Sequence, residues 1–145
     1  MKLEKLLTNI STVAVCGSLD IEIDKIVFDS SQIVKNCMFV CLDGSMSDGH
    51  NFVDFAVAKG AVAVVCQKEF FSTLATTIQV KDTRVALSLL AINFFDNPSK
   101  SLKIVAVVGT NGKSSTAYIT SKLLNDAGKN CGLIGTIYYE YNNIK

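Results

Sequence analysis

The sequence contains no tryptophan, a single proline and a single histidine, and aromatic residues make up only 8% of its 145 residues. No platform for stacking nucleic-acid bases is therefore evident. The 14 basic and 13 acidic residues are dispersed and give a net charge of +1, so no basic stripe indicates a nucleic-acid partner. No apolar run approaches the roughly 20 residues that span a bilayer, so we expect no membrane insertion.

The five cysteines show no pattern typical of a metal site. None belongs to a Cys-x-x-Cys pair, and His50 has no neighbouring cysteine. A zinc site would need about four ligands at short spacings. The N-terminal residues carry dispersed charges and no long apolar core, so we expect no signal peptide. We predict reduced, buried thiols in a cytoplasmic protein.

Hydrophobic periodicity predicts a small mixed-sheet α/β domain before Pro98. We expect strands at 21–28, 37–42, 61–66 and 76–80, and helices at 2–7, 52–59 and 82–95. The last helix should begin at Asp82 or Thr83 as N-cap. Its expected apolar positions are Val85, Leu89, Ile92 and Phe95.

The residues after Pro98 predict a second α/β unit. A strand at 103–108, a helix at 113–127 and a strand at 131–135 are expected to form a βαβ unit. Such a unit implies a parallel sheet with a right-handed crossover. The polar turn around Pro98 is the best boundary signal in the chain.

Two glycines and a lysine lie between the first strand and the helix of that second unit. Gly109 and Gly112 allow a tight turn whose N–H groups point inward, and the helix adds its positive end. Lys113 is placed to reach the β- and γ-phosphates of a nucleotide, and Ser114 to ligate Mg²⁺. The strict P-loop pattern would need glycine where Val107 stands. The alternative is a glycine-rich turn with an exposed lysine.

The segment GTNGKSS (109–115) is similar to the ATP loop of the Mur ligases, which build the peptidoglycan stem peptide of bacteria. Residues 28–65 resemble the N-terminal UDP-sugar-binding domain of that family. Residues 94–115 and GLIGTIYYE (132–140) resemble the family member that adds the third residue of the stem peptide. The resemblance covers nearly the whole chain.

The resemblance implies a UDP-sugar-binding domain at 1–98 and the incomplete start of a P-loop ATP-binding domain at 99–145. It implies an ATP- and Mg²⁺-dependent ligase that joins lysine or diaminopimelate to UDP-N-acetylmuramoyl-L-Ala-D-Glu through an acyl phosphate. The residues that it implies for ATP are Gly109, Thr110, Asn111, Gly112, Lys113, Ser114 and Ser115, with Lys113 catalytic and Ser114 on the metal. Those that it implies for the UDP-linked substrate are Phe28, Ser30, Ser45, Met46 and Ser47.

The sequence departs from the family pattern at two positions. The family's Asp-Ser-Arg is Asp29-Ser30-Ser31 here, so a cation with up to five donors is missing. Ala106 stands where a further glycine is usual. Simpler interpretations stay open for several residues: Ser30 could cap a turn, Asp48 could cap the following helix, His50 could bond loop carbonyls, and Thr116 could cap or pack in its helix.

Other functions also stay open. The chain could be a non-catalytic nucleotide-binding module or fragment, the Mur ligase that adds D-Ala-D-Ala, or an unrelated P-loop kinase. The D-Ala-D-Ala enzyme usually carries Thr-Gly-Ser-x-Gly-Lys, so Thr110 and Asn111 favour the third-residue enzyme. The family builds its active site from three domains, so we expect no turnover by these 145 residues without the rest of the ligase. We also expect uncovered strands to cause self-association through 103–135.

Overall fold

A computed structural model describes residues 1–44, 47–70, 72–137, 139–141 and 144. The chain divides into two compact units, Met1–Ser101 and Leu102–Lys145. None of the helices in these described ranges is long and apolar enough to cross a membrane.

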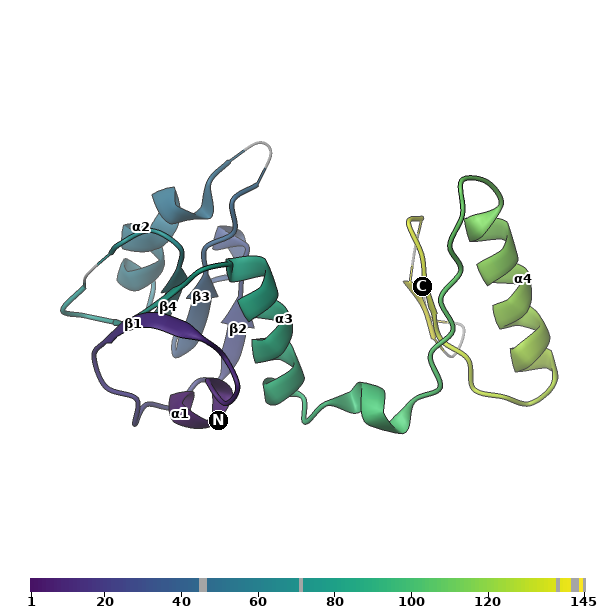
Figure 1. The fold of residues 1–145 in the computed structure, drawn as a ribbon, viewed down its shortest axis with the longest axis horizontal. Helices are drawn as coiled ribbons and strands as arrows, with labels where there is room; N and C mark the ends of the chain where they lie inside the picture. The colour runs from purple at the N-terminus through teal and green to yellow at the C-terminus, as the bar shows by residue number, and fades with distance from the viewer. Residues whose placement is uncertain (45–46, 71, 138, 142–143, 145) are drawn as a thin grey trace. The chain divides into compact units, whose positions relative to one another are not determined.

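The first unit is built on a five-stranded mixed sheet with the strand order β1-β5-β4-β3-β2 (Figure 1). Neighbouring strands from β2 to β5 are parallel, whereas β1 is antiparallel to β5. The strands are β1 (Thr12–Cys16), β2 (Lys25–Val27), β3 (Cys37–Val40), β4 (Ala61–Cys66) and β5 (Thr76–Val80). The helices are α1 (Leu3–Leu6), α2 (Val53–Ala58) and α3 (Thr83–Phe94), with 3-10 turns at Ser30–Gln32, Gly49–Phe52 and Pro98–Ser101. The predicted mixed α/β class is confirmed.

The central strands of the sheet are buried on both faces, because α1 and α3 cover one side and α2 covers the other (Figure 1). Successive residues of a strand point to opposite faces. Met38 of β3 therefore packs in the same cluster as Leu90 of α3, whereas Phe39 packs with Val53 of α2. All four residues of β3 are buried, which explains why this strand is a continuous apolar run rather than an alternating one.

The helix α3 begins as predicted but faces the core with other residues. The Asp82 carboxylate accepts hydrogen bonds from two backbone N–H groups of the first turn, at 2.8 and 3.0 Å, and this confirms the cap. The predicted apolar face is wrong: Val85 and Phe95 are 56% and 65% exposed, whereas Ala86 and Leu90 are buried. Apolar residues lie on more than one side of this helix, and the buried side is the one that packs against the sheet and α1.

Three strands of the first unit differ from the sequence prediction, and the one expected at 37–42 ends at Val40. The strand expected at 21–28 is limited to Lys25–Val27, because only these residues pair with β3. The strand β1 was not predicted at all. Its five residues are exposed, so it shows no burial pattern that periodicity could detect.

The second unit contains α4 (Lys113–Asp126) and two short antiparallel strands, β6 (Leu133–Ile134) and β7 (Tyr139–Glu140). The predicted strand at 103–108 is absent, so the predicted βαβ unit does not form. Strands need a ladder partner, and no described segment pairs with 103–108. The strand predicted at 131–135 is limited to β6, which pairs with β7 rather than with 103–108.

The end of α4 fixes where the following chain lies. Gly128 has a left-handed φ of 74° and donates its N–H to Asn125 O at 2.9 Å, while Lys129 N–H reaches Leu124 O at 2.9 Å. This is the Schellman arrangement that ends many helices. The Asn125 side chain then accepts from Cys131 N–H at 2.8 Å and donates to Cys131 O at 3.1 Å. These bonds hold the start of the β6–β7 hairpin against α4.

Candidate functional site

The glycine-rich loop leads into the N-terminus of α4 through a left-handed turn. Gly112 is the N-cap, with φ 73° and ψ 0°, and no side chain caps the helix there. Gly109 has φ 149°, which also lies in the region that favours glycine. A Cβ at either position would meet nothing nearer than 3.8 Å. Backbone conformation, rather than crowding, therefore requires glycine at both positions.

The hydroxyl residues and the lysine of the loop lie at the first turn of α4. Lys113 is exposed, and its Nζ donates to Thr110 O at 3.3 Å, folding over its own loop. Ser114 and Ser115 follow within the same turn. The first N–H groups of a helix have no partner inside the helix, and the helix dipole adds partial positive charge there. The predicted ATP residues thus form a site with the chemistry to hold an anion.

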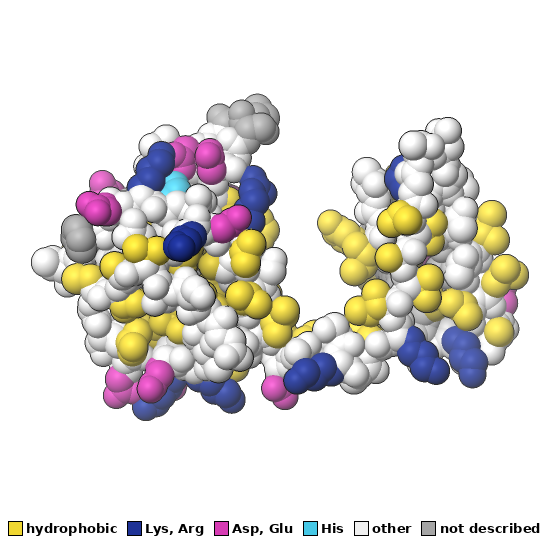
Figure 2. All heavy atoms as spheres, viewed as in Figure 1, with side chains coloured by type: hydrophobic (Ala, Val, Ile, Leu, Met, Phe, Trp, Pro, Cys, Tyr) yellow, Lys and Arg dark blue, Asp and Glu magenta, His cyan; other side chains and the backbone are white. Residues whose placement is uncertain are grey.

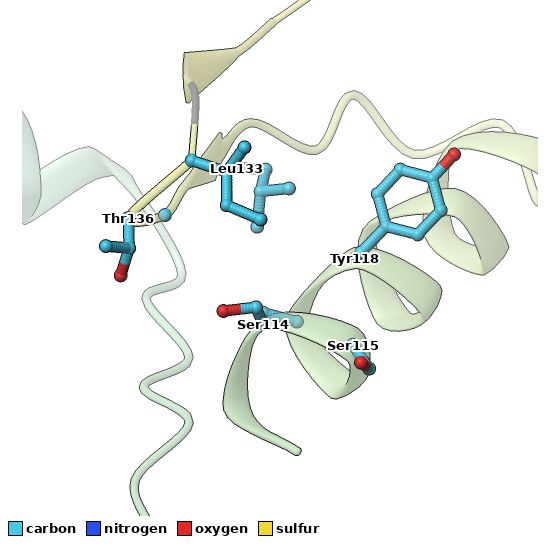
Figure 3. A pocket seen from close by; sticks show the side chains of 8 residues that line it. Ser114, Ser115, Tyr118, Leu133 and Thr136 are labelled. Atoms are coloured by element: carbon cyan, nitrogen blue, oxygen red, sulfur yellow. The ribbon is translucent and has the colours of Figure 1, made fainter. Parts of the chain in front are cut away.

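A cavity of about 260 Å³ lies beside this turn. Figure 3 shows Ser114, Ser115 and Tyr118 on α4 at one side of it, and Leu133 and Thr136 at the other. Its lining residues are Ser114, Ser115, Ala117, Tyr118, Leu133, Gly135, Thr136 and Ile137. Sequence analysis did not predict the contribution of Tyr118 or Thr136, although Thr136 falls in the segment GLIGTIYYE that it singled out. The cavity gives the loop a mostly apolar neighbour with hydroxyls at its edge.

In the first unit, the segments that follow parallel strands gather at one edge of the sheet, where ligands commonly bind in α/β folds. Phe28 and Ser30 follow β2; Phe28 is 57% exposed and Ser30 is half-buried. The Asp29 carboxylate accepts from Ser31 N–H at 2.9 Å and from Ser31 Oγ at 2.8 Å. These bonds, the backbone one first, lower the pKa of Asp29. Ser31, which replaces the family's arginine, thus closes a local turn.

The segment after β3 carries the other predicted substrate residues. Ser45 and Met46 lie outside the described residues. Ser47 is exposed, and its carbonyl accepts from Gly44 N–H at 3.1 Å. Asp43 and Asp48 form an isolated antiparallel bridge.

Asp48 is the centre of a polar cluster at the same edge. Its Oδ1 accepts from His50 N–H at 2.9 Å and from His50 Nδ1 at 2.5 Å, and its Oδ2 accepts from Lys68 Nζ at 2.5 Å. The Lys68 bond and then the His50 bonds hold the pKa of Asp48 below its usual range. Figure 2 shows the single histidine among acidic and basic side chains.

The simpler interpretation, in which Asp48 caps the following helix and His50 bonds loop carbonyls, is partly right. Asp48 does cap the short helix that follows it. His50 does not bond loop carbonyls: its Nε2 accepts the backbone N–H of Gln67 at 3.0 Å. Sequence analysis missed Lys68 and Gln67, which lie 20 and 17 residues from their partners.

A family model described as "Mur ligase family, catalytic domain" matches residues 22–95, just over half of the chain. The chain belongs to the Mur ligase family. The match covers strands β2 to β5 and the polar cluster of the first unit, and it ends before the loop at Gly109. The similarity of that loop to Mur ligases therefore depends on relatives whose match extends beyond residue 95.

One such relative is the UDP-N-acetylmuramoyl-L-alanyl-D-glutamate--2,6-diaminopimelate ligase of Alkaliphilus metalliredigens. It is 43% identical over 138 residues, which are 94% of this chain and 28% of the relative. The chain thus spans a little under a third of the length of the curated relatives that it matches.

Solved Mur ligases share the fold. A MurF structure from Acinetobacter baumannii matches with a TM-score of 0.69 and 25% identity, over 86% of this chain and 27% of that one. The MurF ligase of Thermotoga maritima, solved in complex with ADP, matches with a TM-score of 0.58 and 28% identity, over 70% of this chain and 23% of that one. The predicted family is confirmed.

Proposed function

We propose that this chain supplies the UDP-binding region and the phosphate loop of an ATP-dependent ligase of peptidoglycan precursor synthesis. The ligase would join an amino acid to UDP-N-acetylmuramoyl-L-Ala-D-Glu. The observation that carries the proposal is the 43% identity, over 94% of the chain, to a ligase named for that substrate and for diaminopimelate. The proposed substrate is a soluble nucleotide sugar, which fits the expected cytoplasmic location.

The identity of the relatives favours this ligase over the enzyme that adds D-Ala-D-Ala. Curated relatives named for diaminopimelate are 36–43% identical to the chain. Identity to solved structures does not separate the two enzymes, because the MurF structures are 25–28% identical to the chain and a solved diaminopimelate ligase is 19% identical. Whether the ligase adds lysine or diaminopimelate depends on the residues that bind the incoming amino acid.

The loop residues would bind the triphosphate and stabilise charge during transfer. ATP supplies the phosphoryl group that activates the substrate's carboxylate. Gly109 and Gly112 let the backbone approach the phosphates closely, and the first turn of α4 directs N–H donors at them. Lys113 would exchange its contact with Thr110 O for phosphate oxygens, where its charge offsets the charge of the transferring group.

The residues present fit a magnesium ion that is held chiefly by the nucleotide. Mg²⁺ usually takes one or two protein groups and completes its octahedron with phosphate oxygens and water. Ser114 offers one hydroxyl beside the loop, and the described residues contain no cluster of three acidic, histidine or cysteine side chains that would form a separate metal site. Bound there, the metal would neutralise phosphate charge.

The UDP moiety would bind at the sheet edge in the first unit. Phe28 presents an exposed aromatic ring after β2, and Ser30 and Ser47 offer hydroxyls from neighbouring loops. Ser45 and Met46 complete the proposed set by resemblance alone. An exposed ring and hydroxyls suit a uracil ring and its ribose, which need stacking and short hydrogen bonds.

Separate titrations of the ¹⁵N-labelled chain with UDP and with Mg·ATP test the proposal. UDP should shift amide resonances near Ser30 and Ser47, and Mg·ATP should shift those of 109–116. Lys113→Ala should abolish the ATP shifts, whereas Lys129→Ala, which removes another exposed lysine of the same unit, should not. Unchanged spectra at millimolar UDP would remove the substrate assignment. ATP shifts that survive Lys113→Ala would remove the role of the loop.

A further inference from the structure

A chain of hydrogen bonds joins the segment after β3 to the end of β4 and to the start of α3. His50 connects Asp48 to the backbone of Gln67, as described above. The Gln67 side chain then accepts from the hydroxyl of the fully buried Thr83 at 2.8 Å. Arg84, the next residue of α3, donates to Asp43 O at 2.7 Å. Asp43 and Asp48 are therefore both tied to the sheet edge.

These contacts define the protonation state of the imidazole. A backbone N–H can only donate, so His50 Nε2 must be the acceptor and carries no proton. The proton of the neutral ring then lies on Nδ1, from which it is donated to Asp48. The His50 side chain is only 9% exposed, so water competes little for either bond.

The two partners of Asp48 differ in how well they can hold it. Lys68 is 67% exposed, and an exposed ion pair with a flexible lysine fixes geometry weakly. The His50 side chain is 9% exposed, is shorter than a lysine side chain and is hydrogen-bonded at both ring nitrogens. It therefore fixes the position of Asp48, and with it Ser47, the residue immediately before.

We propose that His50, as the neutral Nδ1–H tautomer, is a positioning residue that holds Ser47 and Asp48 in the conformation that binds the uridine diphosphate part of the substrate. The inference rests on the proposed function, because UDP is taken as the ligand of this edge. His50 itself need not touch the nucleotide. Its effect passes through the carboxylate of Asp48.

The test combines imidazole NMR of the full chain with UDP titrations of three variants. Long-range ¹H–¹⁵N spectra of the wild type should show a protonated Nδ1 and a bare Nε2. His50→Ala should weaken UDP binding about tenfold, the effect expected for losing a hydrogen bond to a charged group. His50→Gln keeps a donor and an acceptor on one side chain and should restore most of the affinity. Lys68→Ala is the matched control and should change affinity by less than about threefold.

Each outcome decides the inference. A proton on Nε2 in the wild type overturns it, and this measurement needs no variant to fold. UDP binding that is unchanged in a folded His50→Ala chain overturns the inference but leaves the proposed function intact. No UDP binding by the wild type overturns both. An equal loss in Lys68→Ala and His50→Ala would give the role to the charge on Asp48 and contradict the role of the imidazole.

Discussion

Lys122 and Glu140 form an ion pair in which the ammonium lies 2.9 Å from Oε1 of an almost wholly buried carboxylate. The glutamate side chain is 7% exposed and the lysine side chain is 41% exposed. The pair joins the middle of α4 to β7, and the other carboxylate oxygen has no hydrogen-bond partner among the described residues. The carboxylate therefore depends heavily on this lysine.

We expect Lys122→Met to lower the free energy of unfolding of the second unit by about 1–3 kcal/mol, because it leaves a charged carboxylate buried without its partner. Urea unfolding followed by hydrogen exchange of α4 measures the effect. Lys129→Met, which removes an exposed lysine after the same helix, should change stability by less than about 0.5 kcal/mol. Equal effects of the two variants would show that the buried pair does not stabilise this unit.

Gly49→Ala should destabilise the first unit by steric conflict. The new Cβ would lie 2.8 Å from Leu42 N and 2.9 Å from Leu42 O, which are backbone atoms that cannot rotate away. We expect a loss of about 1–3 kcal/mol in thermal or urea unfolding. Gly132→Ala is the control, because its Cβ would meet other atoms only at 3.6 Å or more. A stable Gly49→Ala chain would mean that Leu42 and Gly49 lie farther apart than described.

The lowered pKa of Asp48 predicts a loss of stability in acid. The folded state holds this carboxylate charged, through Lys68 first and His50 second, so its pKa is below the unfolded value of about 4. The contribution is therefore complete above about pH 4 and is lost as the pH falls toward the folded pKa. Unfolding curves of the wild type and Asp48→Asn should run parallel above about pH 5 and approach each other as the pH is lowered from about 4 to 2. Curves that stay parallel down to about pH 2 would contradict the assigned ion pair.

Cysteine reactivity should follow burial. Burial raises the pKa of the Cys41 thiol to about 12, and the nearby charges of Cys66 and Asp48 add to this effect. Almost no Cys41 thiolate is therefore present at pH 8. Cys16 is exposed. Iodoacetamide with mass spectrometry should label Cys16 first, and Cys41 only after urea is added. Rapid labelling of Cys41 in the native chain would show that this part of the core opens readily.

The sequence could predict the parts of the fold that depend only on residues close together in the chain. The strands at 61–66 and 76–80 have the predicted bounds, because both are apolar runs between clear turn residues. The cap at Asp82 needs only its own first turn. The proposed phosphate loop is similarly local, since glycine, lysine and serine adjoin one another in the chain.

Features that depend on distant partners could not be predicted. The segment 103–108 is apolar enough for a strand, yet a strand forms only where another can pair with it. Val85 and Ala86 are both apolar, and the packing of α3 against α1 and the sheet selects which one is buried. The polar cluster at Asp48 needs Lys68 and Gln67, which no spacing rule connects to it.

The pairing of β1 with β5 affects the order in which the sheet can be made. Thr12 lies opposite Val80, so 80 − 12 = 68 residues must be added after Thr12 before its partner exists. At 5–20 residues per second, a ribosome takes roughly 3–14 s for that stretch. Strands β2, β3 and β4 can meet earlier, because their partners are closer in sequence. The first strand to be synthesised is thus among the last to find its place, and a nascent chain carries it unpaired until translation has passed residue 80.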